Sequence, residues 1–87
     1  MKLVLPPCGI GDAIALTAAI REYHVSFPNE PIEVAPCEYM AVFQGNPHVS
    51  PWGGALGKVV YLETERHNDV GNIAVSLGLQ MGCNVLD

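Results

Sequence analysis

The chain has 87 residues, of which 49% are hydrophobic and 15% are charged, and its formal net charge is −5. This composition is typical of a globular chain rather than a disordered tail, and residues 1–87 are long enough for one domain at most. A domain of this size buries only about 60 to 65% of its unfolded surface, which predicts marginal stability. The four basic residues form no basic stripe, so nucleic acid is not expected as a partner.

The first predicted strand spans residues 2–5 and leads directly into a helix. Residues 6–7 are both proline, which cannot donate to a strand ladder and therefore ends the strand. Gly9 and Gly11 are expected to supply the backbone angles of a tight strand-to-helix turn. Asp12 then falls at the predicted helix start, where a side-chain oxygen can accept a free N–H and the helix dipole favours an anion.

The predicted helix covers residues 12–27 and carries one apolar stripe. The stripe recurs at spacings of three and four residues, so it is expected to lie on the sheet. It consists of Ala13, Leu16, Ile20, Tyr23 and Phe27.

Strands and helices alternate along the rest of the chain. We expect a strand over 32–35, a short helix near 38–44, a strand over 58–62 and a helix near 69–78. This alternation predicts an α/β fold with a parallel sheet and flanking helices, joined by right-handed crossovers. A parallel sheet of about three strands leaves its edges and part of one face uncovered, so self-association is expected.

Asp12 has two interpretations. It is either a helix cap with no further role, or a carboxylate aimed into the crevice at the carboxyl end of the sheet. In the second case it stays ionised at the helix end and accepts a proton from a substrate hydroxyl. Spacing alone does not separate the two.

Two phosphate-binding motifs are approached but not completed. The series that starts at Gly9 and Gly11 has Ile14 in place of the third glycine of a dinucleotide fingerprint, and the acidic Asp12 disfavours a pyrophosphate. The segment 53–58 lacks both the first glycine of a phosphate loop and the Ser or Thr that would hold magnesium.

The remaining reactive residues predict no cofactor and no metal. Three separated cysteines, Cys8, Cys37 and Cys83, are typical of reduced thiols in a cytoplasmic protein. The start of the chain is too short and too interrupted by proline for a signal peptide, and no apolar run approaches the length of a membrane span. The three histidines, His24, His48 and His67, share no ligand spacing. Trp52 either packs on the edge of the fold or stacks on a sugar ring.

Several features in order carry a family resemblance. They are Gly9-Ile-Gly-Asp12, Thr17, a helix ending at Phe27-Pro28-Asn29, the strand 32–35 and Gly45-Asn-Pro-His-Val49. Together they resemble the amino-terminal part of glycosyltransferase family nine, the lipopolysaccharide heptosyltransferases and their relatives. The likeness is continuous over about residues 1–49 and resumes more weakly at 68–79.

The resemblance implies one half of a two-domain, B-type glycosyltransferase with two Rossmann-like halves across a cleft. Such an enzyme transfers a sugar from a nucleotide donor to an acceptor hydroxyl with inversion. Asp12 matches the family's general base, Gly9 and Gly11 match the turn that lets the acceptor approach, and Thr17 matches a residue near the acceptor side. The implied partner is a sugar acceptor of the lipopolysaccharide type or another glycan.

The chain also departs from the family. Ala18 stands where proline usually follows Thr17, and residues 6–8 lack the usual polar or basic residue before the glycines. The donor-binding carboxyl-terminal half is missing, so this truncated acceptor-side domain is expected to be inactive alone and to meet a nucleotide-sugar donor only with a second domain. The alternatives are a non-catalytic Rossmann-like binding or assembly module and, more weakly, a small nucleotide-binding domain. A reading frame that continues beyond Asp87 would favour the truncated enzyme, and a natural stop would favour the module.

Overall fold

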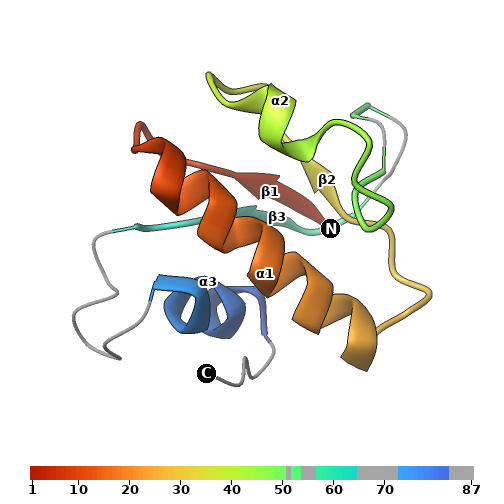
Figure 1. Ribbon diagram of the computed structural model, residues 1–87. Coiled ribbons are helices and arrows are strands. Elements are labelled where there is room, and N and C mark those ends of the chain that lie inside the picture. The colour runs from red at the N-terminus through yellow and green to blue at the C-terminus, as the bar shows by residue number, and fades with distance from the viewer. Residues whose placement is uncertain (51, 54–56, 65–72, 83–87) are drawn as a thin grey trace.

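The structure, a computed structural model, describes residues 1–50, 52–53, 57–64 and 73–82. Three short parallel strands form one sheet in the order β2-β1-β3, and helices pack beside it (Figure 1). The strands are β1 (Lys2–Val4), β2 (Glu33–Val34) and β3 (Val59–Tyr61). The helices are α1 (Ile10–Ser26), α2 (Met40–Phe43) and α3 (Ile73–Met81).

The predicted α/β class with a parallel sheet and flanking helices is confirmed. Each predicted element is present, but its bounds differ from the prediction. The strands and α2 are shorter than expected, α1 begins two residues earlier and ends one residue earlier, and α3 continues to Met81, three residues past the predicted end. The predicted segment 69–72 of the last helix lies outside the described residues. Within the described parts of the chain, no helix combines the length and the hydropathy that crossing a membrane requires.

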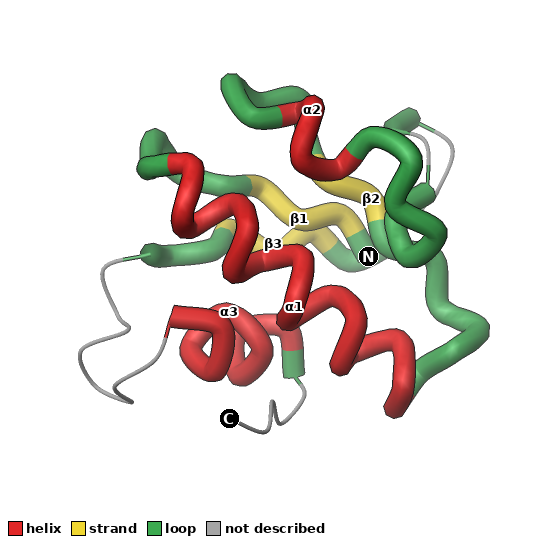
Figure 2. Tube along the Cα trace, viewed as in Figure 1, coloured by secondary structure: helices red, strands yellow, loops and turns green. Residues whose placement is uncertain are grey.

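β1 is the central strand, and its neighbours fix which side chains share a face. Leu3 is in register with Val34 on β2 and with Val60 on β3. Because neighbouring positions in a sheet point the same way, these three side chains form one apolar row. Figure 2 shows α1 and α3 on the same side of the sheet. The apolar row packs in one cluster with buried residues of both helices.

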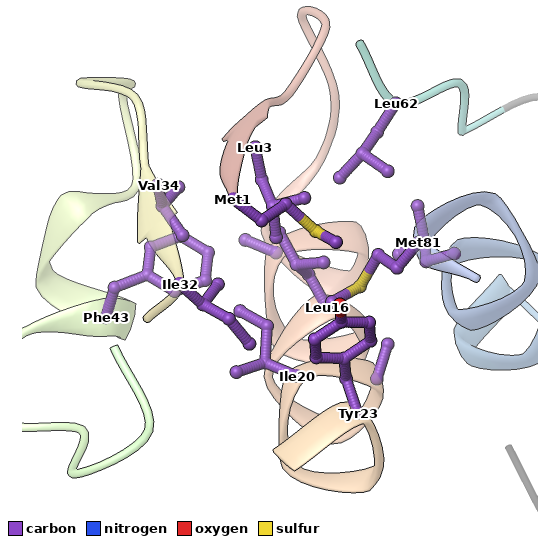
Figure 3. Packing of buried hydrophobic residues seen from close by; sticks show 13 residues of the cluster. Met1, Leu3, Leu16, Ile20, Tyr23, Ile32, Val34, Phe43, Leu62 and Met81 are labelled. Carbon is purple, nitrogen blue, oxygen red and sulfur yellow. The ribbon is translucent and has the colours of Figure 1, made fainter. Parts of the chain in front are cut away.

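The core lies between this row and the inner side of α1. Figure 3 shows Leu16, Ile20 and Tyr23 of α1 pointing toward side chains from β1 and β2. Four members of the predicted stripe are buried as expected: Ala13, Leu16, Ile20 and Tyr23. The prediction is wrong for the fifth member, Phe27, which follows the last residue of α1 and is 43% exposed. Its ring lies against that of Tyr23, at a centroid distance of 4.8 Å.

The described residues cover the second face of the sheet only in part. Lys2 places its Nζ 5.1 Å from the ring centroid of Trp52, and buried Glu33 accepts the N–H of Gly53 at 2.6 Å. The segment 52–53 therefore lies over the β2 side of this face. On the β3 side Val59 is 47% exposed and Tyr61 is 75% exposed.

This uncovered apolar strip predicts self-association. The double substitution Val59→Lys and Tyr61→Lys is expected to shift the chain toward monomer, because lysines on an exposed strand oppose pairing with a second sheet. Sedimentation velocity over a concentration series measures the shift. Val25→Lys, at a position on α1 that is 74% exposed, is the control and should leave the association unchanged. A wild-type chain that stays monomeric at all concentrations contradicts the prediction.

Candidate functional site

A hollow of about 300 Å³ opens at the carboxyl ends of β1 and β2. In α/β proteins this edge of the sheet is where ligands bind, because the loops that follow the strands converge there. The lining comes from the two loops that leave these strands. It consists of Leu5, Pro6, Pro7, Cys8, Pro36, Cys37, Glu38 and Tyr39.

Both loops have the same local design, with proline followed directly by cysteine. Pro7 precedes Cys8 after β1, and Pro36 precedes Cys37 after β2. Proline fixes its own φ and has no N–H to donate, so it stops each strand and stiffens the start of each loop. The two thiols and the side chain of Tyr39 are thereby brought to one hollow.

Asp12 lies beside this hollow, in the first turn of α1. The helix begins at Ile10 with Gly9 as the N-cap, so the expectation that the helix starts at Asp12 is wrong by two residues. Asp12 still serves the helix start, because its Oδ2 accepts the N–H of Gly9 at 3.2 Å while its own N–H donates to the carbonyl of Gly9 at 3.1 Å. The side chain is half-buried, and the hydrogen bond to the Gly9 N–H is exposed.

Gly9 and Gly11 do not supply the special backbone angles that the sequence predicts. Gly9 has φ −84° and ψ 164°, which any residue adopts, and Gly11 is an ordinary residue of α1. The turn is made instead by the extended N-cap and the Asp12 side chain. A Cβ at either glycine would meet no atom within 4 Å, so both positions leave open space on the surface next to Asp12. Their assignment to substrate binding remains a prediction.

Thr17 is not brought to the hollow. Five residues along a helix correspond to a rotation of about 140° around the axis, so Thr17 and Asp12 point in different directions. The Thr17 hydroxyl donates to the carbonyl of Ile14 at 2.6 Å, within α1. The described lining of the hollow also excludes Gly9, Gly11 and Asp12 itself.

The hollow has a negative electrostatic character. Desolvation raises the pKa of the Cys8 thiol above its ordinary value, and the nearby charge of Asp12 raises it further. The pKa of the Tyr39 phenol is also raised, first by desolvation and then by the charge of Glu38. The lining residues that the structure describes include no Lys or Arg. An anionic ligand would therefore be disfavoured here, whereas a neutral or cationic one would not.

Sequence reasoning missed the second wall of the hollow. Cys37, Glu38 and Tyr39 lie in a segment that was predicted only as the start of a short helix. The signal that could have found them is the rule that carboxyl ends of neighbouring parallel strands meet at one edge, since Pro36 ends the strand next to β1. What the sequence does not reveal is that β1 and β2 are neighbours.

The remaining expectations concern Trp52, the segment 53–58 and a metal site. The Trp52 ring lies against Lys2 of the central strand, and the residue is 45% exposed. Whether it also stacks on a sugar ring stays a prediction. Residues 54–56 of the segment 53–58 lie outside the described residues. Among the residues that the structure describes, no group of three His, Cys, Asp or Glu side chains converges to hold a metal ion.

The field of Asp12 at Cys8 predicts a change in thiol reactivity. Asp12→Asn removes a negative charge that raises the Cys8 pKa, so more thiolate should be present at pH 8 and Cys8 should be alkylated faster. The increase should stay below about tenfold, which corresponds to one pKa unit. Quantitative mass spectrometry of the Cys8 peptide after iodoacetamide treatment measures it.

The matched control for this experiment is Glu38→Gln. Glu38 raises the Cys8 pKa less than Asp12 does, so its removal should accelerate alkylation less. Equal rates in the wild type and in Asp12→Asn would place the Asp12 carboxylate away from the hollow.

No family model, curated protein or solved structure matches this chain.

Proposed function

We propose that this chain is the acceptor-side part of an inverting, heptosyltransferase-like glycosyltransferase, with a Rossmann-like architecture and Asp12 as the general base. The observation that carries the proposal is the position of Asp12. A carboxylate stands in the first turn of the helix that follows the central strand, beside a hollow at the carboxyl edge of the sheet. The sequence resemblance over residues 1–49 supports the same assignment.

Inverting sugar transfer requires one proton acceptor next to the hydroxyl of the bound acceptor. As the acceptor oxygen attacks the anomeric carbon and the nucleotide leaves from the opposite side, Asp12 takes the hydroxyl proton. Asp12 stands at the N-terminal end of α1, where the helix dipole places partial positive charge next to the carboxylate. The hydrogen bond from Gly9 orients the group through Oδ2, and a carboxylate has further lone pairs on both oxygens for a substrate hydroxyl.

The lining of the hollow suits an uncharged acceptor. Pro6, Pro7 and Tyr39 offer apolar faces of the kind on which the apolar side of a sugar ring packs. Glu38 and the nearby Asp12 make the surroundings negative, which weakens the case for a small nucleotide-binding domain. A phosphate-bearing ligand normally meets Lys, Arg or bare helix N–H groups, and Asp12 occupies the helix start.

One observation favours a second candidate, a non-catalytic binding or assembly module. The bond between Asp12 and the Gly9 N–H already gives the carboxylate a complete structural role as a cap. A protein that kept the fold but not the chemistry would retain this bond. The two candidates therefore differ in what happens when the acid is replaced in an active context.

The donor pocket of the proposed enzyme lies in a second domain, which predicts how the 87-residue chain behaves alone. Calorimetric titration with ADP-sugars and UDP-sugars should show no saturable binding, and incubation with donor and glycan acceptor should give no transfer. The described lining of the hollow offers no basic side chain to a diphosphate, which supports the same outcome. Saturable micromolar binding of either nucleotide sugar would instead favour the small nucleotide-binding domain.

A further inference from the structure

Two histidines that are distant in the sequence meet at the far end of α1. His24 Nδ1 lies 2.9 Å from His48 Nδ1, and the two rings are nearly perpendicular, with an interplanar angle of 80°. His24 belongs to the last turn of α1, and His48 lies in the loop that follows α2. The pair is about 18 Å along the helix from Asp12, so nothing in it depends on the proposed transferase site.

A second contact orients the His24 ring, and a hydrogen bond of its backbone anchors the loop that carries His48. His24 Nε2 lies 3.3 Å from the carbonyl oxygen of Glu30, and that oxygen can only accept, so Nε2 carries a proton. In the neutral ring, Nδ1 then carries a lone pair, and it faces His48. The backbone N–H of His48 donates to Asn46 Oδ1 at 2.9 Å, which anchors the loop.

This is the arrangement that a metal-ligating histidine adopts. Such a histidine usually donates its other ring N–H to a carbonyl or carboxylate, which fixes the tautomer and the ring orientation. His24 meets this condition through Glu30. Its place in the last turn of α1 adds the negative end of the helix dipole, and the side chain of Glu30 lies nearby with Oε2 accepting the Tyr23 hydroxyl at 2.6 Å.

The 2.9 Å between the two Nδ1 atoms is a hydrogen-bond distance in the metal-free pair, and it is also compatible with one coordination geometry. With metal–nitrogen bonds of about 2.0 to 2.1 Å, two ligand atoms 2.9 Å apart subtend about 90° at the ion. Tetrahedral ligands at the same bond length would be about 3.3 to 3.4 Å apart. A right angle corresponds to adjacent ligands in a square-planar or tetragonal site, the geometry of Cu²⁺ and Ni²⁺ with nitrogen ligands.

We propose that His24 and His48 form a two-histidine site for a divalent transition-metal ion of tetragonal preference, Cu²⁺ or Ni²⁺, bound through both Nδ1 atoms and completed by water. In the metal-free pair, His48 Nδ1 donates its proton to His24 Nδ1. Metal binding moves that proton to His48 Nε2 through solvent, so a neutral pair loses no net proton. The ion then joins α1 to the loop after α2.

Ni²⁺ is the probe for the test, because Cu²⁺ oxidises thiols and the chain has three cysteines. Isothermal titration of the full chain should show one Ni²⁺ bound per chain. His24→Gln and His48→Gln should each weaken the affinity by about tenfold or more, which is a loss of at least about 1.4 kcal/mol. His67→Gln, in the remaining histidine, is the matched control and should leave the affinity unchanged.

A second measurement needs no variant and so remains informative if a substitution unfolds the chain. Paramagnetic Ni²⁺ should broaden the imidazole resonances of His24 and His48 in the wild-type NMR spectrum before those of His67. Absence of Ni²⁺ binding, unchanged affinity in His24→Gln and His48→Gln, or broadening centred on other residues would overturn the proposal. In each of these outcomes the pair serves only as a hydrogen bond.

Discussion

Asp12→Asn is expected to lower the rate of sugar transfer by about 10²- to 10⁴-fold, because it removes the proton acceptor that the proposed mechanism requires. Folding should be almost unaffected. The Asn side-chain oxygen can accept the same N–H of Gly9, so the free energy of unfolding should change by well under ~1 kcal/mol. The combination of a large kinetic effect and a small stability effect is what separates a base from a cap.

The measurement needs a two-domain context, obtained by extending the reading frame or by grafting residues 1–49 into a related two-domain enzyme. Turnover with donor and acceptor is compared with the parent, and chemical denaturation reports the stability of each variant. Glu38→Gln is the matched control, since it removes a carboxylate from the lining of the same hollow without touching the proposed base. It should keep turnover within a few-fold of the parent.

Turnover of Asp12→Asn within a few-fold of the parent would exclude Asp12 as the base. The non-catalytic module would then be the better candidate, and the bond to Gly9 would be the whole role of the side chain. A variant that loses both activity and stability would show that the cap dominates, which the geometry of an exposed bond at 3.2 Å does not predict.

Leu16→Ala is expected to have the largest effect on stability, a loss of about 2 to 5 kcal/mol in the free energy of unfolding. Leu16 is fully buried at the middle of α1, in the core that α1 forms with the sheet and α3. Removal of its side chain leaves a cavity that short elements cannot easily close. An 87-residue domain has a total stability of only about 4 to 13 kcal/mol, so the variant should be close to unfolding at room temperature.

Urea denaturation followed by circular dichroism measures this loss. Ile14→Ala is the matched control, because it truncates an apolar residue of the same helix that is 55% exposed and should cost less than about 0.5 kcal/mol. Equal losses for the two variants would mean that α1 turns a different face to the sheet. A larger loss for Ile14→Ala would reverse the assignment of the buried face.

The sequence by itself determines the kind and order of the local elements. Residues that alternate or recur every three to four positions, and prolines that cannot donate a hydrogen bond, act within a few neighbours along the chain. The strands near residues 2–5, 32–35 and 58–62 and the helix stripe from Ala13 to Tyr23 were therefore predictable. The prediction fails at the ends of the elements. At Phe27 the apolar periodicity continues in the sequence, but α1 has already ended at Ser26.

The start of α1 shows a second limit of sequence reasoning. The sequence predicts that Gly9 and Gly11 supply the backbone angles of a tight strand-to-helix turn and that Asp12 caps a helix starting at that residue. In the structure the same residues form an extended N-cap, and the carboxylate reaches back from the third helical position. Both arrangements satisfy the free N–H groups of a helix start, and composition does not distinguish them.

Only the tertiary structure decides which elements become neighbours, and every candidate site depends on that choice. The order β2-β1-β3 brings the loop with Cys37 beside the loop with Cys8 and creates the hollow next to Asp12. The packing of the loop after α2 against α1 brings His48 to His24, although the two share no ligand spacing in the sequence. Contacts between distant segments depend on the burial of whole faces against one another, and this burial is a property of the assembled fold rather than of any short stretch of sequence.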